Sequence, residues 1–177
     1  MANEPATPCR KSCDDADFEV AGPTAISVLN ECPAVEALSL TRTVLETFLA
    51  HPDLISLPVV DRRTMKPIGL INHALFMSDL AKPYYKEVFL NRSCSTFMDT
   101  HPLVVDEEMP LQEVSIVIAE AGKRVVTNGF LIVADGRYRG IGYTQDVLRI
   151  MADIHRQHSD RLAASGERLE NLVLERT

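Results

Sequence analysis

The chain has 177 residues, of which 46% are hydrophobic and 24% charged, and its formal net charge is −7. This is the composition of a globular protein with enough apolar side chains for a core, and the length suits one compact domain or two small subdomains. The negative charge argues against a general binder of nucleic acid or anionic membranes, since both need a cationic surface.

Residues 1–24 show no apolar period and are predicted to form a flexible tail. The N-terminus lacks the apolar stretch of a signal peptide, and no apolar run approaches the roughly 20 residues that span a bilayer, so we expect a cytoplasmic protein with free thiols. Cys9 and Cys13 in the tail are only half of a metal site, and Cys32 and Cys94 stand alone. No metal site is therefore predicted.

The first periodic segment, "SLTRTVLETFLAHP" (39–52), predicts a helix with Ser39 or Thr41 as its N-cap. Its buried face is expected to hold four apolar residues, namely Val44, Leu45, Phe48 and Leu49. The strand "SLPVVD" follows, then a turn through "RRTMKP", the strand "IGLI" and a helix from about His73 to Ala81.

The same order returns in the second half. "MPLQEVSIVIAEAG" (109–122) predicts a helix with Pro110 in its first turn and Gly122 at its C-terminal cap. The strand "FLIVA", a hairpin turn at Asp135–Gly136 and the strand "YRGIGY" come next, and Thr144 or Gln145 opens the final helix.

Matching residues of the two halves are separated by nearly constant distances along the chain. Pro33 and Pro102 are 69 residues apart, and Gly69 and Gly140 are 71 apart. A repeat of this size indicates two units that each leave a hydrophobic face open and close it against the other. The predicted fold class is α+β, with two small sheets that carry helices on one side, related by a pseudo-two-fold with a cleft between them.

Two stretches, "LPVVDRRTMKPIGLINHALF" and "GFLIVADGRYRGIGYTQDVL", together resemble a tandem CBS-domain pair, or Bateman module. The resemblance covers about residues 25–158. "KPYYKEVFLNRSCSTFMDTHPLVVDEEMPLQEVS" is similar to the CBS pairs that precede bacterial cyclic-di-GMP enzymes of the GGDEF and EAL types. The resemblance implies a regulatory module that binds an adenine nucleotide (AMP-, ADP- or ATP-like) in its cleft and controls an attached output domain.

On this basis we expect four regions in the chain: a tail (1–24), a first repeat with connector (25–90), a second repeat (91–158) and a C-terminal signalling helix (159–177).

Relatives that bind adenosine ligands usually carry Thr or Ser three residues after the strand glycine, and Asp three residues later. The second repeat offers Gly140, Tyr143 and Asp146 at these positions, with Thr144 one residue late. The resemblance thus implies a ribose-binding role for Asp146 and one competent site around the second repeat. The alternative is that Asp146 serves only the dipole of its helix and Thr144 only caps it.

In the first repeat the equivalents of Tyr143 and Asp146 are Asn72 and Leu75, so a ribose acceptor is missing. The resemblance places further ligand-binding candidates on segments that line the cleft: Val35, Asn72, His101, Asn128 and Phe130. Lys123 and Arg124 are candidates for phosphate, or else complement the C-terminal dipole of the preceding helix.

No nucleophile-elbow, phosphate-loop or zinc-hydrolase pattern occurs, so we do not expect an enzyme. His155 and His158 share a helix face, but two ligands are only half of a metal site.

The C-terminal helix carries apolar residues at mixed spacings of three, four and seven: Val147, Ile150, Ile154, Leu162, Leu169 and Leu172. This pattern predicts a homodimer that pairs through the helix, which is expected to lead into an output domain. A ligand-free dimerisation or interaction module is the alternative function.

Overall fold

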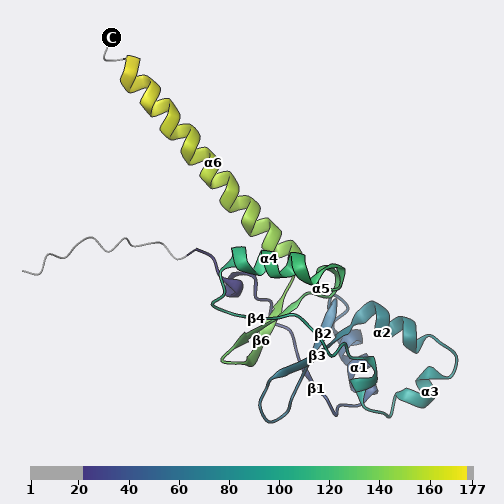
Figure 1. Cartoon of the computed structure of the whole chain (residues 1–177). Helices are drawn as coiled ribbons and strands as arrows, with labels where there is room; N and C mark the ends of the chain where they lie inside the picture. Colours follow the sequence, from purple (N-terminus) through teal and green to yellow (C-terminus); the bar gives the residue numbers. More distant parts are fainter. Residues whose placement is uncertain (1–21, 175–177) are drawn as a thin grey trace, which may run out of the picture.

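The structure is a computed structural model that describes residues 22–174 (Figure 1). The predicted tail, with Cys9 and Cys13, lies outside the described residues except for its last positions. The first half contains a 3₁₀ helix, three strands and three helices: η1 (Ala25–Val28), β1 (Val35–Glu36), α1 (Thr41–Ala50), β2 (Ser56–Val60), β3 (Pro67–Asn72), α2 (His73–Leu80) and α3 (Tyr85–Phe89). The second half follows the same order, except that its extra helix, α5, stands before the hairpin: η2 (Cys94–Phe97), β4 (Val104–Asp106), α4 (Leu111–Ala121), α5 (Lys123–Asn128), β5 (Phe130–Ala134), β6 (Arg137–Gly142) and α6 (Thr144–Leu174).

The two halves carry the same three-stranded sheet, which confirms the predicted α+β class and the repeat. In each, a short strand runs parallel to the first hairpin strand, in the orders β1-β2-β3 and β4-β5-β6. Val59 pairs with Gly69 in one hairpin, and Ile132 pairs with Gly140 in the other. Each hairpin has its register shift immediately after this pair. The equal registers relate the sheets by a pseudo-two-fold.

The hairpin turns follow from local chemistry. Asp135 and Gly136 both have positive φ, 50° and 74°, as the predicted two-residue turn requires. Gly122 ends α4 with φ 78°, as predicted, but the chain enters α5 at the next residue, a helix that the sequence pattern did not reveal.

The sheets are extended by the segments that precede β1 and β4, and these segments cross to the other half. Asn30 exchanges two backbone hydrogen bonds with Ile141 of β6, at 2.8 and 3.0 Å. Asp99 does the same with Leu70 of β3, at 2.8 and 3.0 Å. Asn30 and Asp99 are 69 residues apart, the separation of the two prolines. The segment before the first strand of each half therefore lies along the sheet of the other half.

The hydrophobic cores follow this exchange. Ala25 and Val28 of η1 are buried in the core of the second sheet, together with Leu111, Val114 and Phe130. Cys94 of η2 is buried in the core of the first sheet, which is formed largely by side chains from α1, β2 and α2.

Helix α1 differs from expectation in two details. Its N-cap residue is Leu40, which makes no side-chain cap bond, and the Thr41 hydroxyl instead donates to the backbone carbonyl of Arg92. Leu49, predicted to be buried, is 66% exposed because the helix turns only Val44 and Phe48 fully into the core.

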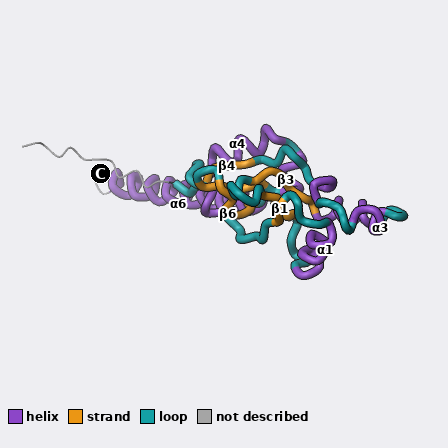
Figure 2. The backbone as a smooth tube through the Cα atoms, turned by 90° about the horizontal axis from the view of Figure 1, so that it is seen from below, coloured by secondary structure: helices purple, strands orange, loops and turns teal. Residues whose placement is uncertain are grey.

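Helix α6 is the longest element and leaves the body of the molecule (Figure 1). In the view from below, the strands occupy the middle of the body, with α6 at one end and α3 at the other (Figure 2). The first turns of α6 pack on α4, and Val147 is buried there. Among the described helices, none combines the length and apolar character needed to cross a bilayer.

Candidate functional site

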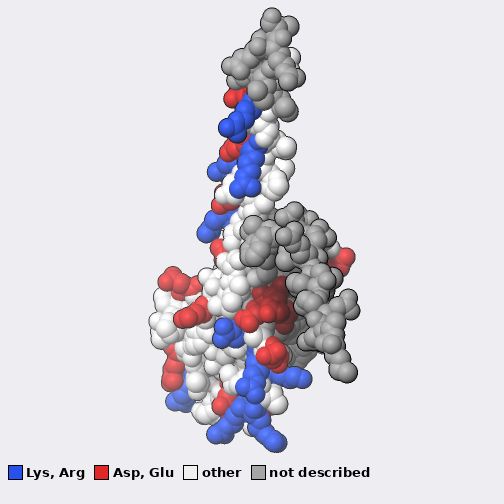
Figure 3. Space-filling model, turned by 90° about the vertical axis from the view of Figure 1, so that its left-hand side faces the viewer, with Lys and Arg blue, Asp and Glu red and all other residues white. Residues whose placement is uncertain are grey.

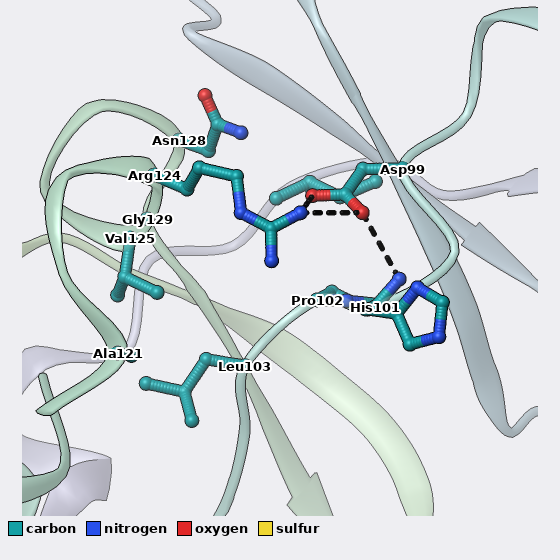
Figure 4. Close-up of a pocket in the computed structure, with 10 residues that line it drawn as sticks. Asp99, His101, Pro102, Leu103, Ala121, Arg124, Val125, Asn128 and Gly129 are labelled. Carbon is teal, nitrogen blue, oxygen red and sulfur yellow. Dashed lines mark hydrogen bonds and ion pairs between the residues drawn. The ribbon is translucent and has the colours of Figure 1, made fainter.

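Two adjoining cavities lie where the end of β3 and the start of α2 meet the second half of the chain. Their volumes are about 510 and 210 Å³. The larger extends along α2 and the segment 96–99, and the smaller lies against the segment 101–103 and α5 (Figure 4). Four lining residues are common to both: Leu70, Asp99, Arg124 and Asn128. We call the two cavities together the α2–α5 hollow.

A charged pair, Asp99 and Arg124, lies across this hollow. The Arg124 guanidinium lies 3.4 Å from the Asp99 carboxylate, which also accepts from the backbone N–H of His101 at 3.0 Å (Figure 4). Asp99 is held in place because its backbone pairs with Leu70. The Arg124 side chain is 68% exposed, and such a pair contributes about 1 kcal/mol or less. Breaking this ion pair so that Arg124 can bind an anion therefore costs little free energy.

A second polar contact joins the two halves at the edge of the hollow. The Asn72 side chain donates to the Asn128 side chain at 2.9 Å, and its oxygen accepts from the N–H of Leu75, which caps α2. Asn128 ends α5, and Gly129 then takes φ 82°. A Cβ at Gly129 would lie 2.7 Å from the backbone oxygen of Gly142, so only glycine permits this close approach.

The hollow combines cationic, amide and apolar groups. Lys123 and Arg124 supply positive charge, and Leu70, Phe97 and Met98 supply apolar surface. The lining also holds carboxylates and amides able to bond hydroxyl or ring nitrogen groups. This arrangement suits a small anionic ligand with a flat apolar part, and the larger volume lies in the range of ligand pockets.

The corresponding junction of the second repeat leaves only a small cavity of about 180 Å³, and the protein's own side chains pack beside it. Tyr143 takes the place that Asn72 has in the first repeat, directly after the second hairpin strand. Tyr143, Tyr138 and Cys32 pack together on the buried Leu131 and Ile141, and the Tyr138 hydroxyl donates to the Cys32 carbonyl at 2.9 Å. Burial, with a smaller effect from Cys32, raises the pKa of Tyr143 to about 12. Burial likewise raises the pKa of the Cys32 thiol to about 11.

Asp146 has partners within the chain. One carboxylate oxygen accepts from the Asn30 amide at 3.1 Å, and the other lies 3.3 Å from the Arg149 guanidinium. A small cavity of about 180 Å³ adjoins them. Leu75, at the matching position of α2, is 65% exposed and lines the α2–α5 hollow.

Thr144 is the first residue of α6, and its hydroxyl oxygen is buried without a hydrogen-bond partner among the described residues. It lines a largely apolar groove of about 500 Å³ between α4, α5 and α6, whose other walls include Ile118, Val126 and Leu148. We call this the α4–α6 groove.

The structure thus divides the predicted ligand-binding residues into three groups. Asn72, His101 and Asn128 meet at the α2–α5 hollow, whereas Tyr143, Thr144 and Asp146 lie at the start of α6. The other three are covered by protein: Val35 and Phe130 lie in the cores, and Gly140 lies against Leu29 and Asn30.

Asp99 was missed as a site residue. A signal for it exists, because its distance of 69 residues from Asn30 equals that between Pro33 and Pro102. No group of three or more His, Cys, Asp or Glu side chains between residues 22 and 174 of one chain is arranged to hold a metal ion.

Comparison with known proteins identifies the repeat. The family model described as "CBS domain" matches residues 94–153, which lie within the predicted second repeat (91–158). No curated protein matches the chain by sequence.

Solved structures of CBS pairs share the fold over most of the chain. The CBS-pair protein CBSX2 from Arabidopsis thaliana is 21% identical, with a TM-score of 0.57 over 76% of this chain and 98% of its own. CBSX2 in complex with AMP is 20% identical, with a TM-score of 0.58 over 76% and 99% of the two chains. The CBS domain of a bacterial CNNM/CorC family Mg²⁺ transporter in complex with ATP is 16% identical, with a TM-score of 0.60 over 76% and 91%. The chain therefore has the fold of a CBS pair.

Proposed function

We propose that the protein is a regulatory ligand-sensing module that binds an adenine nucleotide in the α2–α5 hollow. The observation that carries this proposal is the contrast between the two junctions. At one, Asn72 lines a cavity of about 510 Å³; at the other, Tyr143 packs with its neighbours, and the matching cavity is only about 180 Å³. Two similar structures are complexes with AMP and ATP, which supports a nucleotide as the ligand.

The chemistry of the hollow assigns parts of the nucleotide to residues. Phosphate would lie beside Lys123 and Arg124, with the guanidinium released from Asp99 to form a charge-assisted bond to the phosphate. The base would lie among Leu70, Phe97 and Met98 and bond to the Asn128 amide. The freed Asp99 carboxylate would accept hydrogen bonds from the ribose hydroxyls. It would thus take the role of the aspartate that is replaced by Leu75 in the first repeat.

A bound ligand could act on α6 through one short contact. Gly129 follows Asn128 directly, and a Cβ there would lie 3.0 Å from the Tyr143 ring, so the backbone at Gly129 touches the residue that precedes α6. A ligand that shifts Asn128 would shift Tyr143 and the first turn of α6. Regulation requires two positions of α6 relative to the body, and a ligand that binds more tightly when α6 is in one of them.

In this proposal α6 carries the signal between two copies and towards an attached output domain. The protein would be a cytoplasmic homodimer, and a bacterial GGDEF- or EAL-type enzyme is the output domain that the sequence resemblance favours. The module itself would have no catalytic role.

Thermal unfolding with and without AMP, ADP and ATP tests the ligand. At 100 times the dissociation constant, binding stabilises the folded state by about 2.7 kcal/mol, which gives a clear rise in melting temperature. Arg124→Gln should weaken the apparent affinity for the nucleotide at least about tenfold and so reduce the rise in melting temperature, because a charge-assisted bond to phosphate is lost. Arg149→Gln is the matched control, since it removes an arginine from the ion pair at the other junction.

The alternative, a ligand-free interaction module, is favoured by one observation: the polar side chains Asp99, Arg124, Asn72 and Asn128 bond to one another in pairs. It predicts no melting shift with any of the three nucleotides. Loss of the shift in Arg149→Gln but not in Arg124→Gln would instead place the ligand at Asp146.

A further inference from the structure

We propose that His155 and His158 of two copies form a four-imidazole site for a divalent transition metal, such as Zn²⁺, between paired α6 helices. The proposal rests on the pairing of two copies proposed above. It begins from a stripe of residues on α6 that alternates spacings of three and four: Leu148, Met151, His155, His158, Leu162, Ser165, Leu169 and Leu172. This is the a/d pattern of a two-stranded coiled coil over more than three heptads.

Leu148 and the part of the stripe from His155 to Leu162 are uncovered in the single chain. Leu148 is 62% exposed and Leu162 is 72% exposed, and both histidines are exposed. The face that packs on the body centres on Val147, which is buried, and on Ile150. Met151, the second residue of the stripe, also packs against this core, so the free part of the stripe begins beyond it. Beyond the first turns, α6 stands clear of the body (Figure 1). A helix of this length and polarity needs a partner to cover its apolar stripe.

The neighbours of the stripe favour a second copy of the same helix as that partner. The positions beside it on one flank are small, Ala152, Ser159 and Gly166, which permits close approach of another helix. The acidic residues Asp153, Asp160 and Glu167 occupy the f positions of the heptad, on the opposite face. In the space-filling view, charged side chains follow one edge of the projecting helix and uncharged ones the other (Figure 3).

The stripe is also continuous with an apolar surface on the body. Leu148, its first residue, lines the α4–α6 groove together with Ile118 and Val126, which is 59% exposed. A second copy related by a two-fold axis parallel to the helices would cover the groove and the stripe together. Each a and d residue would then lie opposite the same residue of the other copy.

In such a pair the histidines meet in two adjacent layers. His155 occupies an a position and His158 the next d position, so each faces its counterpart. On one helix, residues three apart lie about 5–6 Å from each other at Cβ. Two polar layers weaken an apolar seam unless something satisfies them. Four neutral imidazoles around one ion provide the tetrahedral nitrogen set that Zn²⁺ prefers, and a single chain supplies only two of them.

The test compares metal binding and self-association of the full chain in chelator and in Zn²⁺. We expect one Zn²⁺ per two chains by equilibrium dialysis, and a monomer–dimer midpoint in sedimentation that falls at least about tenfold when Zn²⁺ is added. Co²⁺ at the site should give a tetrahedral spectrum without thiolate-to-cobalt charge transfer, which separates it from binding by cysteines.

Two sets of variants make the outcomes distinct. His155→Ala with His158→Ala should abolish the zinc response, whereas His51→Ala, which changes an exposed histidine on the body, should keep it. His155→Leu with His158→Leu should dimerise without metal and bind none, since leucine fills both layers.

Several outcomes would overturn the metal site. A wild-type dimer that binds no Zn²⁺, one Zn²⁺ per single chain, or binding that survives the double alanine variant would each do so. If the double leucine variant stays monomeric, the helix pairing itself fails, and with it the site, while nucleotide binding in the α2–α5 hollow is tested separately by Arg124→Gln.

Discussion

The side-chain amide of Asn30 donates a hydrogen bond to the carboxylate of Asp146 across 3.1 Å, although the two residues are 116 positions apart. This contact joins the segment that precedes β1 to the first turn of α6. In the folded chain the acid thus has a bonding partner of the kind that a ribose hydroxyl would otherwise supply.

Asp146→Ala is therefore expected to lower the free energy of unfolding by about 1 kcal/mol, because a hydrogen bond to a partly buried charge is lost. The melting shift with nucleotide should stay as in the wild type. Urea unfolding with and without ligand measures both quantities.

Asp153→Ala is the matched control for this change. Asp153 also pairs with an arginine three residues later on α6, but its side chain is 56% exposed and the pair is longer, 3.9 Å. We expect a change within about 0.5 kcal/mol. Equal effects of the two substitutions would contradict a structural role for the Asn30 contact.

Gly140→Ala tests how closely the crossing segment lies on β6. A Cβ at this position would be 2.7 Å from the backbone oxygen of Asn30 and 2.8 Å from the Leu29 side chain. We expect a loss of about 1–3 kcal/mol in unfolding free energy, as for other overpacked sites.

Gly166→Ala, the matched control, should instead raise the unfolding free energy. A Cβ there meets nothing within 4 Å, and the residue lies inside α6, so the helix gains up to about 1 kcal/mol from alanine. A Gly140→Ala protein as stable as the wild type would show that the segment can lift from the sheet without cost.

Alkaline pH should destabilise the protein through Tyr143. Burial raises the pKa of Tyr143 to about 12, compared with an ordinary pKa of about 10 in the unfolded chain. Below pH 10 Tyr143 keeps its proton in both the folded and the unfolded state, so its ionisation does not lower the unfolding free energy. Between pH 10 and 12 only the unfolded chain releases it, so the unfolding free energy falls.

Tyr143→Phe should make this fall shallower, and stability measured by urea unfolding from pH 8 to 11.5 checks it. Tyr84→Phe, which changes an exposed tyrosine, serves for comparison. Identical slopes in the wild type and Tyr143→Phe would mean that Tyr143 ionises as freely in the fold as outside it.

The Cys32 thiol should be slow to alkylate. Because burial raises the pKa of Cys32 to about 11, little thiolate is present at pH 8. Mass spectrometry after a short iodoacetamide pulse should show Cys32 unmodified in buffer and modified in urea. Rapid modification in buffer would indicate that the packing of Cys32 with Tyr138 and Tyr143 opens readily.

The parts of the fold that sequence predicted are those fixed by nearby residues. The Asp135–Gly136 turn and the two hairpins depend on local backbone preference and alternating burial, and both are present. Helix α5 was missed because Gly122, a good helix end, also begins the next helix.

The site was harder to predict because its shape depends on contacts distant in sequence. The sequence showed that the residues at the two junctions, Asn72 and Tyr143, differ. It did not show that the cavities beside them differ in size. Tyr143 packs beside Cys32, and this pairing arises only once the segment before β1 has crossed to the second sheet. Asp99 faces Arg124 for the same reason, since its own segment crosses to the first sheet.

The exchanged segments also bear on how the molecule unfolds. Residues 94–153 contain a whole repeat, yet the core they form is completed by Ala25 and Val28 from far upstream. The first core is likewise completed by Cys94, from the start of that stretch. Neither half can lose its structure without uncovering the interior of the other, so the body should melt in a single cooperative transition. A fragment of either half would be left with an unsealed core, prone to aggregate rather than to fold.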